Sequence, residues 1–153
     1  MSRPGTTLSE YFTLDHRSCD SQWTEVENAV EQGDTDAAMR LWRRFDANLR
    51  QHLEMEEQIL FPAFEQQTGM TGGGPTFVMR SEHEQMRGLL GQMAEAAARG
   101  DSQELLDQGD TLLMLIAQHN QKEEGMLYPM AEQALDAEWS DLRARLEGFE
   151  PAP

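Results

Sequence analysis

Four histidines and two glutamates recur in this sequence at spacings that suit metal ligands. His52 is followed four residues later by Glu56, and His119 is followed four residues later by Glu123. On a helix of 3.6 residues per turn, each pair places an imidazole and a carboxylate on one face, about 6 Å apart along the axis. One histidine on an apolar helix face is more often a core residue than a ligand, but all four histidines of this chain lie on such faces. The candidate metal-binding residues are His16, His52, Glu56, His83, His119 and Glu123.

The two glutamates point to metal as their partner. Glu56 and Glu123 share the inward faces of their helices, and a buried carboxylate must be protonated, paired with a cation or bound to a metal. No Lys or Arg occupies a repeating inward position, so a metal is the remaining partner of adequate charge. Four imidazoles and two carboxylates are too many ligands for one tetrahedral zinc ion, but they suit two metals bridged by the glutamates. Each metal would take two histidines, His16 with His52 and His83 with His119.

The ligand types favour iron. Mixed imidazole and carboxylate ligation with open coordination positions suits iron best, with manganese or zinc as substitutes, and such a site is expected to react with small oxidants.

Two competing metal-binding motifs are excluded by the residues at their key positions. The stretch HEQMR lacks the second histidine of a zinc-protease HExxH, because its fifth residue is Arg87. No histidine has a glutamate three positions before it, as ferritin-type di-iron bundles require.

The chain repeats itself. An offset of 67 residues places His16 on His83 and Gly33-Asp34 on Gly100-Asp101. The same offset places HLEMEEQILFP on HNQKEEGMLYP without a gap. Such a match indicates two copies of one helical hairpin. Two hairpins related by a pseudo-twofold axis would present matching sets of side chains to one shared core.

The elements that must position these residues are helices. Strands are not expected, because β-branched residues are few and no run alternates between apolar and polar residues. Apolar residues recur every three or four positions along four long segments, separated by Gly-Asp pairs and a glycine-rich loop. We predict an all-α fold, an up-down-up-down four-helix bundle made of two pseudo-repeated hairpins, with a short C-terminal helix. The predicted helices span about Leu8–Gln32, Asp34–Gln67, Pro75–Arg99, Asp101–Leu135 and, in the tail, about 137–147.

Two finer features of the helices are predicted. The inward stripes include Val30, Leu41, Ala63, Ala97 and Met126. Pro62 and Pro129 each follow a histidine of the repeat, at a place where a proline removes a backbone hydrogen bond and clashes with the carbonyl four residues back. We expect both helices to bend there, so that Phe61 and Tyr128 close one mouth of the site.

Composition narrows the classes of partner. A length of 153 residues predicts one domain, residues 1–153, with its core at about 8–135. The net charge of −16 argues against binding to nucleic acid or to anionic membranes, and no apolar stretch approaches the roughly 20 residues that span a bilayer. The N-terminus has no apolar targeting core, and Cys19 is the only cysteine, so no intramolecular disulfide is expected. These features predict a cytoplasmic protein.

Other residues that carry chemistry are assigned to the core or the surface. Glu57 and Glu124 follow the two bridging candidates by one residue, about 100° further round the helix, and are expected on a solvated face. Whether either also binds a metal is left open. Cys19 and most of the ten methionines are expected to pack in the core.

The order His, HxxxE, His, HxxxE, with EExxLFP and EExxLYP endings, resembles the hemerythrin-like, or HHE cation-binding, domain over roughly residues 8 to 135. The resemblance implies a four-helix bundle that holds a non-haem di-iron centre, bridged by carboxylates and by an oxo or hydroxo oxygen. The terminal ligands it implies are His16, His52, His83 and His119, and the bridges are Glu56 and Glu123. Oxygen-carrying hemerythrins have a further histidine one turn after the third-helix ligand, where this chain has Arg87. Oxygenated adducts are therefore expected to be short-lived.

The function that the resemblance implies is that of a cytoplasmic di-iron protein that binds or senses dioxygen, peroxide or nitric oxide, rather than a high-turnover enzyme. Two alternatives stay open: a di-iron oxidase or catalase-like enzyme, and an iron-handling or iron-centre repair protein. A metal-free helical interaction module is a third, and it predicts a colourless protein whose melting temperature a chelator leaves unchanged. The oligomeric state and the downstream partner are left open.

Overall fold

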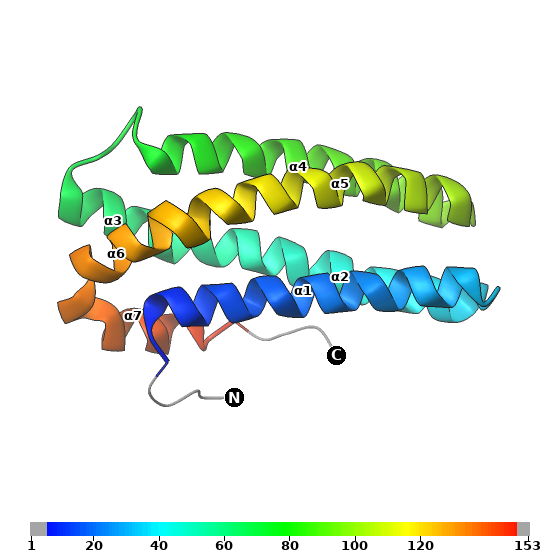
Figure 1. Ribbon diagram of the computed structural model, residues 1–153, viewed down its shortest axis with the longest axis horizontal. Coiled ribbons are helices and arrows are strands. Elements are labelled where there is room, and N and C mark those ends of the chain that lie inside the picture. The colour runs from blue at the N-terminus through cyan, green and yellow to red at the C-terminus, as the bar shows by residue number, and fades with distance from the viewer. Residues whose placement is uncertain (1–5, 150–153) are drawn as a thin grey trace.

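The computed structural model describes residues 6–149, and every regular element in that range is a helix. Four long helical segments run side by side along the molecule, alternately up and down, and a short helix lies at one end (Figure 1). The prediction of an all-α four-helix bundle with a short C-terminal helix is confirmed. None of the described helices is long and apolar enough to cross a membrane.

The two hairpins have the same order of elements. The first consists of α1 (Leu8–Glu31), α2 (Thr35–Met55), a π-helical turn η1 (Glu56–Leu60) and α3 (Phe61–Thr68). The second consists of α4 (Pro75–Ala98), α5 (Ser102–Lys122), a π-helical turn η2 (Glu123–Leu127) and α6 (Tyr128–Ala134). A 3₁₀ turn, η3 (Asp136–Glu138), then leads into α7 (Trp139–Leu146).

The turn within each hairpin is built from a Gly-Asp pair. Gly33 and Gly100 have φ angles of 76° and 70°, a left-handed conformation that glycine adopts without the steric cost of a Cβ. The next residue, Asp34 or Asp101, donates its backbone N–H to a carbonyl in the last turn of the helix before it. The side chain of the same aspartate caps the first turn of the following helix. Each pair therefore ends one helix and begins the next.

The apolar core is divided in two along the bundle. One cluster lies where α3, α6 and α7 meet the beginning of α1, and it includes Phe12, Phe61 and Tyr128. The other lies toward the Gly-Asp turns and includes Trp23 and Phe45. Along each long helical segment, the histidine stands between residues of the two clusters. The candidate ligands therefore form a polar layer between two apolar ones.

Several predicted core positions lie at the edge of the core, where Leu41, Ala63 and Ala97 still pack against the buried clusters. Val30, Leu41, Ala63 and Ala97 are only half-buried. A neighbour is buried in each case, and these neighbours are Ala29, Trp42, Phe64 and Ala96. Steps of three or four residues drift round a helix of 3.6 residues per turn, so the inward stripe passes to the adjacent residue as the helix lengthens.

Both prolines act through a π-helical turn. The residue before each proline donates its backbone N–H to the carbonyl of the glutamate five positions back, Phe61 to Glu56 and Tyr128 to Glu123. Each proline then stands in the first turn of the following α-helix, where proline is tolerated. The wider turn accommodates the missing N–H and the proline ring without ending the helix. Where a bend was predicted, each helix thus changes to a π turn that begins at a candidate ligand.

Met126 lies on the surface, contrary to the predicted stripe. It is 48% exposed, whereas the next residue, Leu127, is buried. The π turn adds one residue to the helix and so advances the inward position by one. The counterpart of Met126 in the first hairpin, Ile59, is buried because α7 packs against η1 and places Leu142 and Leu146 in the same cluster.

Candidate metal centre

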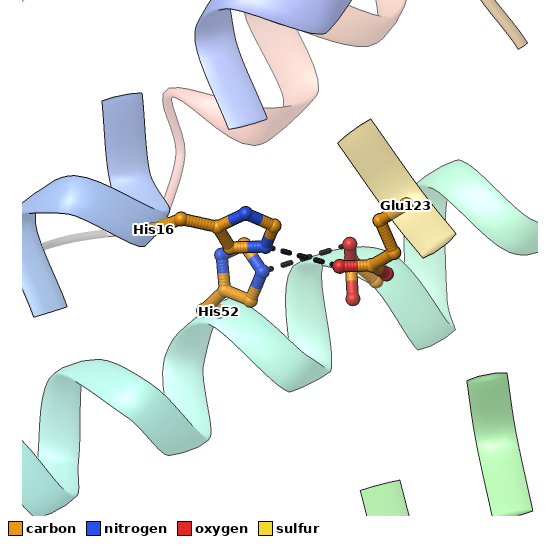
Figure 2. A group of neighbouring side chains, drawn as sticks. His16, His52 and Glu123 are labelled. Carbon is orange, nitrogen blue, oxygen red and sulfur yellow. Dashed lines mark hydrogen bonds and ion pairs between the residues drawn. The ribbon is translucent and has the colours of Figure 1, made fainter. Parts of the chain in front are cut away.

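The six residues predicted as metal ligands lie together in the middle of the bundle. They form two overlapping groups, and within each group the potential ligand atoms lie within 4.8 Å of one another. One group contains His16, His52, Glu56 and Glu123, and the other contains Glu56, His83, His119 and Glu123. Figure 2 shows His16 of α1, His52 of α2 and Glu123 of η2 pointing toward one another. The two glutamates belong to both groups, which is the arrangement that bridging carboxylates need.

Each shared glutamate contacts histidines of both hairpins. Glu123 Oε1 lies 3.0 Å from His16 Nε2 and 3.2 Å from His119 Nε2. Glu56 contacts the other two histidines. Its Oε1 lies 3.0 Å from His83 Nε2, and its Oε2 lies 3.6 Å from His52 Nε2. Histidines and glutamates alike are buried. The cluster therefore joins the two hairpins at their shared centre.

Buried donor atoms without partners show that these residues fit a metal. Within the described residues, Nε2 of His52, His83 and His119, Oε1 of Glu56 and Oε2 of Glu123 make no well-directed hydrogen bond, although the three nitrogens lie 3.0 to 3.6 Å from glutamate oxygens. An unpaired buried polar group costs roughly 1–3 kcal/mol, and a charged one costs more. All five atoms are nitrogen or carboxylate donors of the kind that iron, manganese and zinc accept. Cations held in the two overlapping groups would satisfy them.

Glu57 and Glu124 belong to the site, and their assignment to a solvated face is wrong. His83 Nδ1 donates to Glu57 at 2.6 Å, and His16 Nδ1 donates to Glu124 at 2.7 Å. Each carboxylate comes from the opposite hairpin and has a side chain only 22% or 23% exposed. Neither is a member of the two groups of potential ligands. Their geometry is that of carboxylates that orient a metal-binding histidine through its far nitrogen.

Asp15 and Glu82 make the corresponding contacts to the other two histidines, and sequence reasoning missed both. His52 Nδ1 donates to Asp15 at 2.7 Å, and His119 Nδ1 donates to Glu82 at 2.8 Å. The repeat contains the signal, because an acidic residue immediately precedes the first histidine of each hairpin. Because Nδ1 donates to a carboxylate, Nε2 is the nitrogen of each imidazole that faces the cluster, and once it has lost its proton it can offer its lone pair to a metal.

Arg87 turns away from the cluster toward an outer carboxylate. It donates to both oxygens of Glu57, at 2.9 and 2.8 Å, and to Glu84 at 3.1 Å. In the other hairpin Arg17 donates to Glu124 at 2.7 Å. These two arginines therefore support the carboxylates that hold His83 and His16.

Tyr128 brings a polar atom into the site, whereas its counterpart Phe61 does not. The phenolic oxygen lies 2.5 Å from Glu56 Oε2, 2.8 Å from Glu123 Oε1 and 3.0 Å from His16 Nε2. The Phe61 ring stacks on the α4 histidine with the ring centroids 5.5 Å apart. Both rings are fully buried, but only the tyrosine exchanges hydrogen bonds with the cluster.

When no metal is bound, the contacts within the cluster favour a protonated His83 beside an ionised Glu56. Burial alone would lower the pKa of His83, but the Glu56 carboxylate close to its Nε2 and the hydrogen bond with Glu57 raise it to about 9. Burial alone would raise the pKa of Glu56, but His52 and His83 hold it well below its ordinary value. Burial, reinforced by the glutamates, holds the pKa of Tyr128 well above its ordinary value. Metal binding must therefore displace protons from the histidines.

A cavity of about 10 Å³ adjoins the cluster on the side of the Gly-Asp turns. This volume is about that of one water-sized molecule. Three of the four histidines line it, together with Cys19, Leu49, Met86, Ile116 and Asn120. Cys19 is buried as predicted, and burial raises the pKa of its thiol to about 12.

Comparison with known proteins points to one family. The family described as the hemerythrin HHE cation binding domain matches residues 7–131 and, in a second match, residues 75–152. The second match begins at α4, as the first begins at α1. An uncharacterized hemerythrin-like protein of Schizosaccharomyces pombe is 27% identical over 135 residues, which cover 88% of this chain and 64% of that relative. The chain thus spans less than two thirds of the relative's length. No solved structure matches this chain.

Proposed function

Because the chain belongs to the hemerythrin HHE cation-binding family, we propose that it holds two iron ions between its hairpins and binds or senses a small oxidant there. The observation that carries this proposal is the pair of overlapping ligand groups with unpaired Nε2 and carboxylate atoms turned inward. Dioxygen, peroxide and nitric oxide are the proposed ligands. Iron held in the site would supply the redox chemistry toward such molecules.

The side chains of the cluster divide this work. His16 and His52 would hold one ion, His83 and His119 would hold the other, and Glu56 and Glu123 would be shared. The outer carboxylates keep a proton at each Nδ1 and so keep each Nε2 free for metal. The two apolar clusters above and below the layer exclude bulk water.

The cavity beside the cluster supports a small neutral ligand. Its lining is mainly apolar, with Leu49, Met86 and Ile116 among the contributing side chains. A space for one water-sized molecule suits a diatomic gas or hydrogen peroxide better than a hydrated anion. The net charge of −16 also works against anionic ligands.

Reversible oxygen carriage is not part of the proposal. Arg87 stands where the carriers have another histidine, and its guanidinium is committed to Glu57. A guanidinium has no lone pair for a metal. We therefore expect oxidation to the ferric state on exposure of the reduced protein to air, with no persistent oxygenated spectrum.

Metal analysis combined with visible spectroscopy tests the proposal. Protein loaded with iron under anaerobic conditions should retain about two iron ions per chain, and its spectrum should differ before and after dithionite. His119→Ala should lose most of the iron, whereas Glu84→Gln, at a side chain 77% exposed, should retain it. Full retention by His119→Ala would refute the assignment. A colourless protein without iron would favour the metal-free interaction module instead.

A catalase-like or oxidase activity is the second candidate, and the position of Tyr128 favours it. Its hydroxyl carries a proton at the centre of the cluster, within hydrogen-bond distance of both shared glutamates. A proton donor at that place is what repeated reduction of an oxidant needs. If the protein consumes many molecules of peroxide per iron, and if Tyr128→Phe consumes them more slowly, the result would support the enzyme. Stoichiometric consumption would support the binding protein.

A further inference from the structure

The two metal positions of the proposed site have matching ligands but different surroundings. We call the position between His16 and His52 the first position, and the position between His83 and His119 the second. The 67-residue repeat pairs Tyr128 with Phe61 and Lys122 with Met55. Both of these differences touch the cluster or the carboxylates behind it.

The first difference is an additional oxygen atom at the first position. The hydroxyl of Tyr128 lies 3.0 Å from His16 Nε2, the atom that would bind the metal there. The second position has the Phe61 ring stacked on His83 instead. A phenyl ring offers no lone pair to a hard cation. The first position therefore has one more oxygen donor within reach.

The second difference is charge. At the second position Lys122 pairs with Glu82, the carboxylate behind His119. At the first position Asp15 stands behind His52, and no Lys or Arg nitrogen among residues 6–149 lies within 4.0 Å of it. The counterpart of Lys122 there is the buried and uncharged Met55.

Each position also has one arginine behind it, so the number of arginine charges is the same at both, although Arg87 makes two contacts with its carboxylate and Arg17 makes one. Arg17 supports Glu124 behind the first position, and Arg87 supports Glu57 behind the second. Each arginine also pairs with one acidic residue three positions away on its own helix. The lysine is thus the unmatched cation, and it leaves one uncompensated negative charge behind the first position and none behind the second.

We propose that the two positions are unequal in affinity and that the first position fills before the second. The inference rests on the proposed two-metal site and adds an order of loading to it. The uncompensated Asp15 and the Tyr128 oxygen both favour a divalent cation between His16 and His52. A protein supplied with limiting metal then holds one ion, at the first position.

Titration of the metal-free protein with Co²⁺ tests this order. Binding is followed by calorimetry and by the visible absorption of the bound cobalt. Two steps of one ion each are expected, with the first at least about tenfold tighter, the scale on which outer-shell partners alter metal affinity.

Two variants exchange each unequal residue for its counterpart in the repeat. Lys122→Met, at a side chain 45% exposed, should tighten the second step and leave the first unchanged. Tyr128→Phe should weaken the first step more than the second, because the hydroxyl lies beside His16 but also contacts both shared glutamates. Arg99→Met, at an exposed residue at the end of α4, removes the same charge far from the site and should leave both steps unchanged.

The results of the titration distinguish a failure of the loading order from a failure of the proposed two-metal site. Two bound ions of equal affinity would overturn the order of loading and leave the two-metal site standing. The same holds if Lys122→Met tightens the first step rather than the second. No binding of Co²⁺ would overturn the proposed function and this inference together.

Discussion

Each histidine ring of the site is held at its outer nitrogen by a carboxylate from a different helical element. The four Nδ1 contacts measure 2.6 to 2.8 Å, so the rings are oriented before any metal arrives. Ordering a side chain costs free energy, and a ring already ordered does not incur that cost on binding. At the residue scale, the outer carboxylates therefore prepare the site.

Glu124→Gln tests that role. The amide loses the charge that fixes the His16 ring, and we expect metal affinity to fall by about 10- to 100-fold while the fold is kept. Metal titration with a circular dichroism control measures both. Glu84→Gln removes a carboxylate that contacts Arg87 but no histidine, and it should leave affinity unchanged. Equal effects of the two variants would contradict the orienting role.

The protonation of His83 predicts how the metal-free protein responds to alkali. Its folded-state pKa of about 9 lies above the ordinary value of 6.5. A raised pKa adds stability that is fully present below pH 6.5 and is lost as the pH rises through 9. We expect the free energy of unfolding to fall by at most about 3 kcal/mol across that window. Urea denaturation at a series of pH values, in the presence of a chelator, measures the loss.

The metal-loaded protein is the control for this pH effect. A metal-bound imidazole carries no proton at the ligating nitrogen, so the alkaline loss should be absent when the site is filled. A metal-free protein whose stability rises from pH 6.5 to 9 would contradict the assignment.

At the scale of elements, the π turns set the register of the second half of each hairpin. Both turns begin at a shared glutamate and end just before the residue that precedes a proline. Such turns are frequent at functional sites, because one extra residue re-aims a side chain without breaking the helix. In η2 the extra residue moves the inward position from Met126 to Leu127.

Alanine substitutions at these two neighbours measure the register. Leu127→Ala removes a side chain that is 1% exposed, and it should cost about 2–5 kcal/mol of unfolding free energy. Met126→Ala, at a residue 48% exposed, should change it by no more than about 0.5 kcal/mol. Urea denaturation of both variants decides the matter. The reverse order of costs would place a regular α-helix through this segment.

At the scale of the whole molecule, the cluster joins two hairpins that otherwise pack mainly within themselves. Helix α1 packs chiefly on α2, and α4 packs chiefly on α5. The contacts of both shared glutamates, and those of Glu57 and Glu124, cross from one hairpin to the other. Metal at this junction would therefore stabilise the assembled bundle more than either hairpin alone.

Removal of metal should lower the melting temperature. A ligand present at a thousandfold excess over its Kd stabilises the folded state by about 4 kcal/mol. In a chain of this size each kcal/mol is worth about 2–4 °C, so we expect a decrease of roughly 10 °C on chelation. Potassium chloride at matching ionic strength is the control, because the net charge of −16 makes the fold sensitive to salt. An unchanged melting temperature would argue against a structural contribution from metal.

The sequence by itself was enough to predict the bundle, the two hairpins and the six residues at their centre. These features depend on local periodicity, because a repeat of 3.6 residues and a spacing of four place His52 and Glu56 on one face in any helix. The Gly-Asp turns are equally local, since both ends of the turn lie within six residues. Because the sequence repeats after 67 residues, the candidate ligands of the second hairpin supported the choice of those in the first.

Only the tertiary structure decided which residues surround that centre. Glu57 and Glu124 reach histidines in the opposite hairpin, and Asp15 reaches a histidine on the next helix. The tertiary structure also decided that the Tyr128 hydroxyl reaches Glu123, and that α7 covers Ile59 but not its counterpart Met126. The physical reason is that such contacts depend on how helices rotate and pack against one another, and the π turns change that rotation by one residue. Periodicity along a single helix specifies a face, but the partner of that face is set by chain segments distant in sequence.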